Sequence, residues 1–76
     1  MVQAFIMIEA DTGRAEALLG TVRELGSVAE ANIVAGDYDV IIEAEAEEGY
    51  DVIGAVATEV RSLEDVADTK TYVCLE

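Results

Sequence analysis

The segment Gly36-Asp37-Tyr38-Asp39 holds the densest set of groups in this sequence that suits recognition of a small ligand. A glycine turn exposes backbone N–H groups that can donate to a carboxylate, Asp39 can accept from an ammonium, and Tyr38 can form a wall. This array suits a zwitterion. A plain hairpin turn needs only Gly36-Asp37. The alternative, in which Tyr38 simply packs and Asp39 is a surface residue, stays open on this motif alone.

Residues for catalysis are much harder to find. The chain has no histidine, and its single cysteine, Cys74, stands between Val73 and Leu75 in a strand-like segment. A cysteine among apolar strand neighbours is more often a packed thiol than a reactive one. We therefore expect no catalytic residue and no cofactor, and we expect that the protein is not an enzyme.

Three alternating carboxylates raise the question of a metal site. Glu43, Glu45 and Glu47 repeat every second residue, and such oxygens can bind Mg²⁺ or Ca²⁺. A solvated strand face explains the same spacing, and we prefer that interpretation. One cysteine without histidine cannot form the usual zinc sites within one chain. We expect no metal.

The composition limits the class of protein. Seventeen acidic residues against four basic ones give a net charge of −13 in 76 residues, of which 53% are hydrophobic. Such a chain is expected to fold as one domain, residues 1–76, and to be repelled by nucleic acid and by anionic membranes. Because carboxylates are spread from Glu9 to Glu76, we interpret the acidity as adaptation to high salt, a halophilic trait, rather than as a cation-binding surface. A single cysteine and no apparent signal peptide or membrane span predict a cytoplasmic protein.

The hydrophobic pattern predicts six elements in the order β-α-β-β-α-β. Period-2 alternation marks strands and an i, i+3, i+4, i+7 stripe marks helices. The first helix opens at Thr12-Gly13 and stops at Gly26, and the strands of the central hairpin meet at the Gly36-Asp37 turn. The remaining predicted elements are strands at residues 2–9, 27–35, 38–46 and 66–75 and a second helix at residues 51–63.

This order predicts an α+β, ferredoxin-like βαββαβ sandwich with an antiparallel sheet of order 4-1-3-2. Both helices would cover one face, leaving Phe5, Met7 and Ile41 on the other, with Tyr72 or Val73 as further candidates. Leaving these apolar groups in water is costly, at about 25 cal/mol per Å². We therefore predict a homodimer, a dimeric α/β barrel-like assembly, with those first three residues at its interface. A monomer with scattered surface hydrophobics is the alternative.

The whole chain resembles the effector-binding (RAM) domain of the Lrp/AsnC transcriptional regulators. The resemblance rests on the opening strand Ala4-Phe5-Ile6-Met7-Ile8, the helix end Arg23-Glu24-Leu25-Gly26-Ser27-Val28, the central Gly36-Asp37-Tyr38-Asp39 as a G-x-Y-D turn, and the closing Thr69-Lys70-Thr71-Tyr72-Val73. The helix-turn-helix that binds DNA in such regulators is not expected in residues 1–76, which are similar to a stand-alone effector domain.

The resemblance implies a ligand site and an assembly. In that family, sheet-to-sheet dimers join into octamers or decamers and bind amino acids between dimers. Carried over, the ligand-binding residues would be the following: Gly36 and Asp37 through backbone groups, Tyr38 as a wall, Asp39 toward the amino group, and Thr69 and Thr71 through hydroxyls. Full-length regulators of the same family would be possible partners, without direct contact to nucleic acid or membrane.

The resulting hypothesis is a non-enzymatic, amino-acid-sensing and oligomerisation module that modulates transcription regulators or amino-acid metabolism. Two alternatives remain at this stage. One is an accessory ACT-like sensor domain that docks on an enzyme, and the other is a small dimeric enzyme of ferredoxin-like fold. The absence of histidine and of a convincing acid–base pair argues against the enzyme.

Overall fold

The burial pattern of the first strand shows why one face of the sheet is buried and the other is exposed. Ala4, Ile6 and Ile8 are fully buried, whereas Phe5, between them, is 37% exposed. Successive side chains of a strand point to opposite faces, so the buried residues face the helices and Phe5 faces away. This confirms the predicted alternation.

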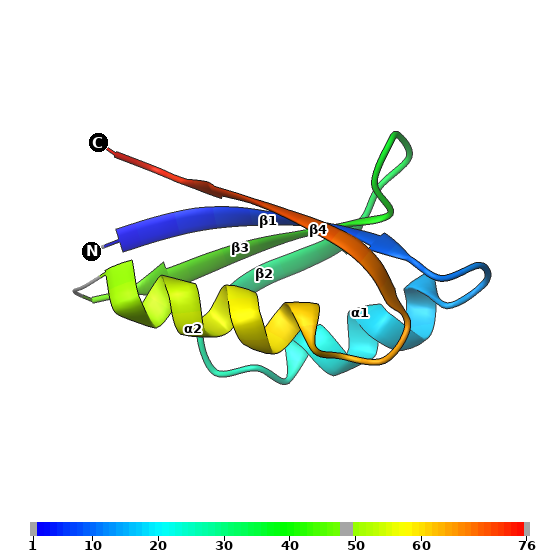
Figure 1. Cartoon of the computed structure of the whole chain (residues 1–76), viewed down its shortest axis with the longest axis horizontal. Helices are drawn as coiled ribbons and strands as arrows, with labels where there is room; N and C mark the ends of the chain where they lie inside the picture. Colours follow the sequence, from blue (N-terminus) through cyan, green and yellow to red (C-terminus); the bar gives the residue numbers. More distant parts are fainter. Residues whose placement is uncertain (1, 48–49, 76) are drawn as a thin grey trace.

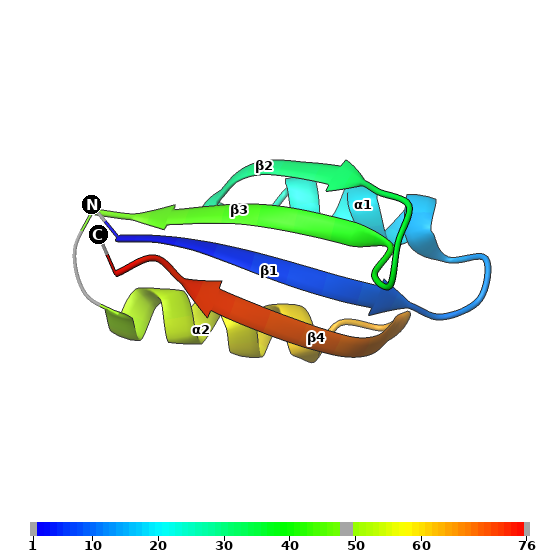
Figure 2. The same ribbon diagram turned by 90° about the horizontal axis from the view of Figure 1, so that it is seen from above.

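The structure, a computed structural model, describes residues 2–47 and 50–75. The strands pair antiparallel in the order β2-β3-β1-β4, which confirms the predicted ferredoxin-like sandwich. Both helices lie on one side of the sheet, and the opposite side is uncovered (Figures 1 and 2). The elements are β1 (Val2–Ala10), α1 (Ala15–Arg23), β2 (Val28–Ile33), β3 (Val40–Ala46), α2 (Tyr50–Arg61) and β4 (Val66–Val73).

The core lies between the sheet and the two helices. Leu18 and Val22 of α1 are buried at i and i+4, and Ile53, Val56 and Val60 form the matching stripe of α2. They pack against fully buried residues of the central strands, such as Ile42. Burying each large aliphatic side chain contributes about 1.5–3 kcal/mol. None of the helices in the described ranges is long and apolar enough to cross a lipid bilayer.

The ends of several elements differ from the prediction. α1 ends at Arg23 rather than near Gly26, because the N–H groups of Glu24 and Leu25 donate to Thr21 and Val22 and tighten the chain into turns. α2 ends at Arg61, not at residue 63.

The central hairpin has a longer connection than the predicted tight turn. β2 stops at Ile33 and β3 starts at Val40, so residues 34–39 form a loop. Gly36 has a φ of 158°, a positive value that residues with side chains rarely adopt, but far from the left-handed φ that a two-residue Gly-Asp turn of type I′ needs.

Candidate functional site

The loop of residues 34–39 rises from the sheet on the side away from the helices (Figure 1). Three hydrogen bonds that involve Asp39 anchor this loop. The Val34 N–H donates to the Asp39 carbonyl (2.8 Å), the Asp39 N–H donates to the Ile8 carbonyl (2.9 Å), and the Ala10 N–H donates to Asp39 Oδ2 (2.8 Å). Asp39 therefore fastens the loop to the end of β1 with both backbone and side chain.

A hollow of about 270 Å³ opens at this end of β1. Its volume lies just below the ~300–1,000 Å³ typical of small-molecule sites. Three acidic residues, Glu9, Asp11 and Asp39, belong to its lining, which is completed by Ala10, Thr12, Gly13 and Ala15. Carboxylates in this arrangement favour a cationic group such as an ammonium.

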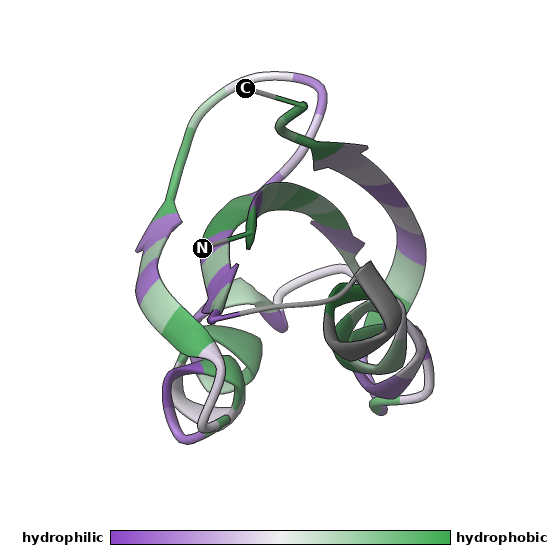
Figure 3. Ribbon diagram, turned by 90° about the vertical axis from the view of Figure 1, so that its left-hand side faces the viewer, coloured by the Kyte–Doolittle hydropathy of each residue, from purple (hydrophilic) through white to green (hydrophobic). Residues whose placement is uncertain are grey.

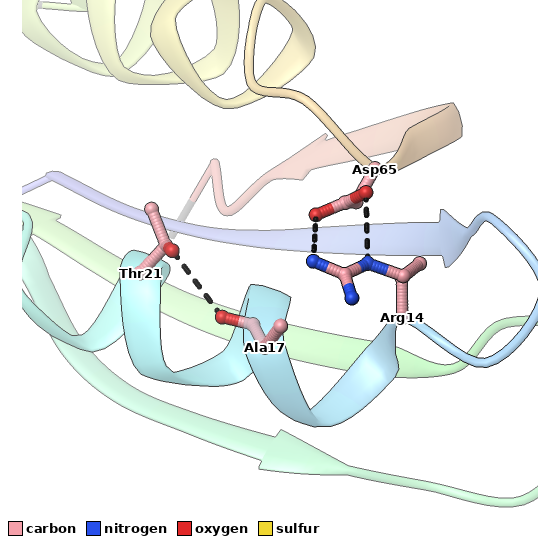
Figure 4. Close-up of polar contacts among 4 residues, drawn as sticks. All are labelled: Arg14, Ala17, Thr21 and Asp65. Carbon is pink, nitrogen blue, oxygen red and sulfur yellow. Dashed lines mark hydrogen bonds and ion pairs between the residues drawn. The ribbon is translucent and has the colours of Figure 1, made fainter.

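Contacts to Asp65, which were not predicted from the sequence, hold the Asp11 side of the hollow in place. Arg14 Nε and Nη2 donate to the two carboxylate oxygens of Asp65 at 3.0 and 3.3 Å (Figure 4). The Asp11 N–H donates to the Asp65 carbonyl at 2.7 Å. Hydrogen bonding to Asp65, with its charge, raises the pKa of the exposed Arg14 guanidinium. Asp65 thus joins the loop before α1 to the turn before β4.

The backbone of Asp65 offers the one signal that could have revealed this contact. Its φ is 73°, in the left-handed region that aspartate tolerates better than most residues. The predicted second helix covers residues 51–63 and the next predicted strand begins at residue 66, so no role was predicted for Asp65. An aspartate between a predicted helix and a predicted strand is also a candidate for a turn residue with a left-handed φ.

The predicted ligand residues do not all meet within one chain. Asp39 alone among them lines the hollow. Gly36 and Asp37 are exposed in the loop, and Tyr38 is half-buried. Thr69 and Thr71 are half-buried on β4, where they pair with Ile8 and Ile6.

Paired residues of neighbouring strands point to the same face of a sheet. The side chains of Thr69 and Thr71 therefore lie on the helix-covered side, while the loop rises on the other side. The six-residue site remains a prediction.

The uncovered face of the sheet, here called the open face, carries the three residues predicted for a dimer interface. Met7 pairs with Ile41, and Phe5 pairs with Glu43 on one side and with Tyr72 on the other. Tyr72, 48% exposed, thus joins this face, whereas Val73 pairs with the buried Ala4. Viewed along the strands, both helices lie below the sheet and the open face is free (Figure 3).

The remaining candidate groups lie apart from one another. Gln3 Nε2 donates to Glu43 Oε1 on the open face, and Cys74 is half-buried just beyond β4. In the parts of the chain that the structure describes, no group of three carboxylate or cysteine side chains is arranged to hold a metal ion.

The arrangement defines a ferredoxin-like βαββαβ domain with one open sheet face and a hollow of about 270 Å³ beside its central loop. The family model of the Lrp/AsnC ligand binding domain matches residues 3–76. The chain therefore belongs to the Lrp/AsnC ligand-binding domain family. No curated protein sequence matches the chain closely enough to be counted as a relative.

Solved structures show the same fold. TTHA0845 from Thermus thermophilus is 30% identical with a TM-score of 0.88, covering 100% of this chain and 95% of that one. E. coli AsnC is 22% identical with a TM-score of 0.88, covering 99% of this chain and 51% of that one. The transcriptional regulator NMB0573 from Neisseria meningitidis, solved in complex with L-Met, is 21% identical with a TM-score of 0.79, covering 99% and 50%.

Proposed function

We propose that this chain is a non-enzymatic, amino-acid-sensing and self-associating module that acts on transcription regulators or on amino-acid metabolism. The observation that carries the proposal is the match of the Lrp/AsnC ligand binding domain to residues 3–76. A relative with this fold, the Neisseria regulator, was solved with L-Met. Binding, not catalysis, is the activity that such a domain supplies.

The proposed ligand site is the loop of residues 34–39. Its amino group would meet the carboxylates of the hollow, among them Asp39, and its carboxylate would accept from backbone N–H groups of Gly36 and Asp37. Tyr38, Thr69 and Thr71 would complete the site where neighbouring dimers meet. Such a site would make ligand binding and assembly mutually dependent.

The first association step is a homodimer through the open face. On this face Phe5 is 37% exposed and Tyr72 is 48% exposed. Met7 lies on the same strand as Phe5, and Ile41 of β3 pairs with Met7. A domain of this size gains much from covering such a face, because a small chain buries little apolar surface alone. Further association of dimers, to an octamer or decamer, belongs to the same proposal.

A ligand screen tests the proposal. The purified chain in molar KCl is melted with each of the twenty amino acids, and positive ligands are titrated by calorimetry. We expect at least one amino acid to raise the melting temperature. Asp39→Asn should weaken its binding, because the charge that meets the ammonium is lost while an acceptor oxygen remains. Asp37→Asn, in the same exposed loop, is the matched control.

Other outcomes favour other functions. Absence of any amino-acid response, together with tight binding to a purified metabolic enzyme, would favour an accessory sensor domain. Turnover of a metabolite that is lost in Tyr38→Phe would favour an enzyme. A sizing experiment with Phe5→Glu tests the interface separately: an unchanged mass would move the dimer contact elsewhere.

A further inference from the structure

Two strands of the sheet have a neighbouring strand on one side only. The order β2-β3-β1-β4 places β2 at one edge of the sheet, and Figure 2 shows α1 behind it. The outer side of an edge strand carries backbone N–H and C=O groups that can pair with a strand of another molecule, so proteins cover or interrupt such edges. The β2 edge is both covered and interrupted.

The hydrogen bonding of the sheet determines which backbone groups of β2 point outward. In an antiparallel pair, residues alternate between bonding to the neighbouring strand and directing their N–H and C=O away from it. The Glu45 N–H donates to the Ser27 carbonyl, so every second residue of β3 from Glu45, including Ile41, directs its backbone toward β2. Ile41 pairs with Asn32. Ala31, the residue before Asn32, therefore presents its N–H and C=O to the outer edge.

Arg23, the last residue of α1, covers this position. Its Nη2 and Nε donate to the Ala31 carbonyl at 2.9 and 3.3 Å. Ala31 is only 2% exposed although it lies on an edge strand, whereas its chain neighbours Glu30 and Asn32 are exposed. The guanidinium thus occupies the acceptor to which the N–H of an added strand would donate.

The β2 edge is irregular on the N-terminal side of Ala31. The register with β3 shifts between Val28 and Glu30, which leaves Ala29 as an extra residue. Such a bulge bends an edge strand and interrupts its row of backbone groups. Arg23 therefore covers the part of the edge that remains regular.

The sequence around Ala31 is suited to pair with a second copy of itself. If two β2 strands lie antiparallel with Ala31 opposite the second copy's Ala31, each N–H donates to the carbonyl of the other. Glu30 then lies opposite the second copy's Asn32, so the acidic residues do not face each other. Within one chain Asn32 Nδ2 already donates to Glu30 Oε1 at 3.2 Å, which shows that these two groups are compatible.

We propose that Arg23 keeps the β2 edge closed, and that without it two copies join β2 to β2, antiparallel about Ala31. The inference goes beyond the proposed function, because it concerns the edge of the sheet and neither its open face nor the ligand loop. Repulsion between chains at −13 cannot keep this edge closed in molar KCl, where the screening length is only about 3 Å. A carbonyl that already accepts from a guanidinium stays occupied there.

Removal of the guanidinium tests the proposal. Arg23→Met removes one positive charge, so general repulsion predicts weaker association, whereas an opened edge predicts stronger association. Sedimentation velocity in molar KCl should show a species of about twice the wild-type mass. Arg61→Met, in the last turn of α2, changes the charge equally and should keep the wild-type mass. Arg23→Ala, with the best intrinsic helix former, is measured beside it, and circular dichroism verifies that each variant is folded.

Amide hydrogen exchange at Ala31, read by NMR, locates the contact. Pairing of β2 with β2 gives the Ala31 N–H an acceptor, so its exchange in Arg23→Met should slow at least about tenfold relative to wild type. Mere loosening of the end of α1 would make the same exchange faster. Folded Arg23→Met and Arg23→Ala proteins that keep the wild-type mass would overturn the proposal. So would a larger species in which Ala31 gains no protection, or one that Arg61→Met forms equally.

Discussion

The strongest test of the site's architecture is the removal of the Asp39 carboxylate. Its Oδ2 accepts from the Ala10 N–H at 2.8 Å, and the two residues are 29 positions apart. In Asp39→Ala that half-buried donor loses its partner. Hydrogen bonds to charged groups contribute roughly 1.5–3 kcal/mol, and partial access of water reduces this, so we expect a loss of about 1–2 kcal/mol in the free energy of unfolding.

The matched variant is Asp39→Asn, which keeps an acceptor oxygen of nearly the same shape. Both variants remove one negative charge from a chain at −13, so any relief of repulsion is common to them and cancels in the comparison. Asp39→Asn is expected to lose less than half of what Asp39→Ala loses. The difference between the two losses in the free energy of unfolding measures the contribution of the acceptor oxygen to stability.

Urea denaturation in molar KCl measures both variants. With an m-value of about 1 kcal/mol/M for a chain of this size, the expected loss lowers the urea midpoint by about 1–2 M. If the midpoints of Asp39→Ala and Asp39→Asn coincide, the carboxylate does not anchor the loop. Asp37→Ala, in the exposed part of the loop, serves as a control and should stay near wild type.

Three further predictions concern the scaffold and its charge. Ile6→Ala removes a fully buried side chain, and urea denaturation should show a loss of about 2–5 kcal/mol; a loss below about 1 kcal/mol would mean that the core is not packed as described. Asp65→Ala forces an alanine to a φ of 73° and should lose about 1–2 kcal/mol, more than Asp65→Gly, which loses the same ion pair without the strain; the opposite order would contradict the left-handed assignment. Raising KCl from about 0.1 to 1 M shortens the screening length from about 10 to 3 Å, so the melting temperature should rise, and a flat series would count against salt adaptation.

The parts of the fold that could be predicted depend on short-range patterns. Ala4, Ile6 and Ile8 alternate with exposed neighbours, and Leu18 and Val22 repeat at helical spacing. These patterns arise because one side of each element is buried, and the sequence of a single segment is enough to show its pattern. From the order of the elements, the topology of the sheet followed.

The contacts that build the site could not be predicted in this way. The Asp39 carboxylate meets the N–H of Ala10, and Arg14 meets Asp65 across 51 positions. Both contacts form only when folding brings the ends of different helices and strands together. The G-x-Y-D segment was found because its residue types are unusual for a turn, but its anchoring role depends on the fold. The open-face prediction succeeded for Phe5 because strand alternation alone determines the face.

The proposed ligand loop and the proposed dimer face share a boundary, and this has a thermodynamic consequence. The loop rises on the same side of the sheet as the open face, and the Asp39 N–H donates to the carbonyl of Ile8, the residue that follows Met7. A ligand that orders Tyr38 therefore changes the surface on which a second copy would dock. By linkage, the factor by which an amino acid tightens the dimer must equal the factor by which dimerisation tightens amino-acid binding. Calorimetric titrations well above and well below the dimer dissociation constant measure the second factor, and sedimentation with and without ligand measures the first. Equal affinities at both protein concentrations would show that loop and face act independently.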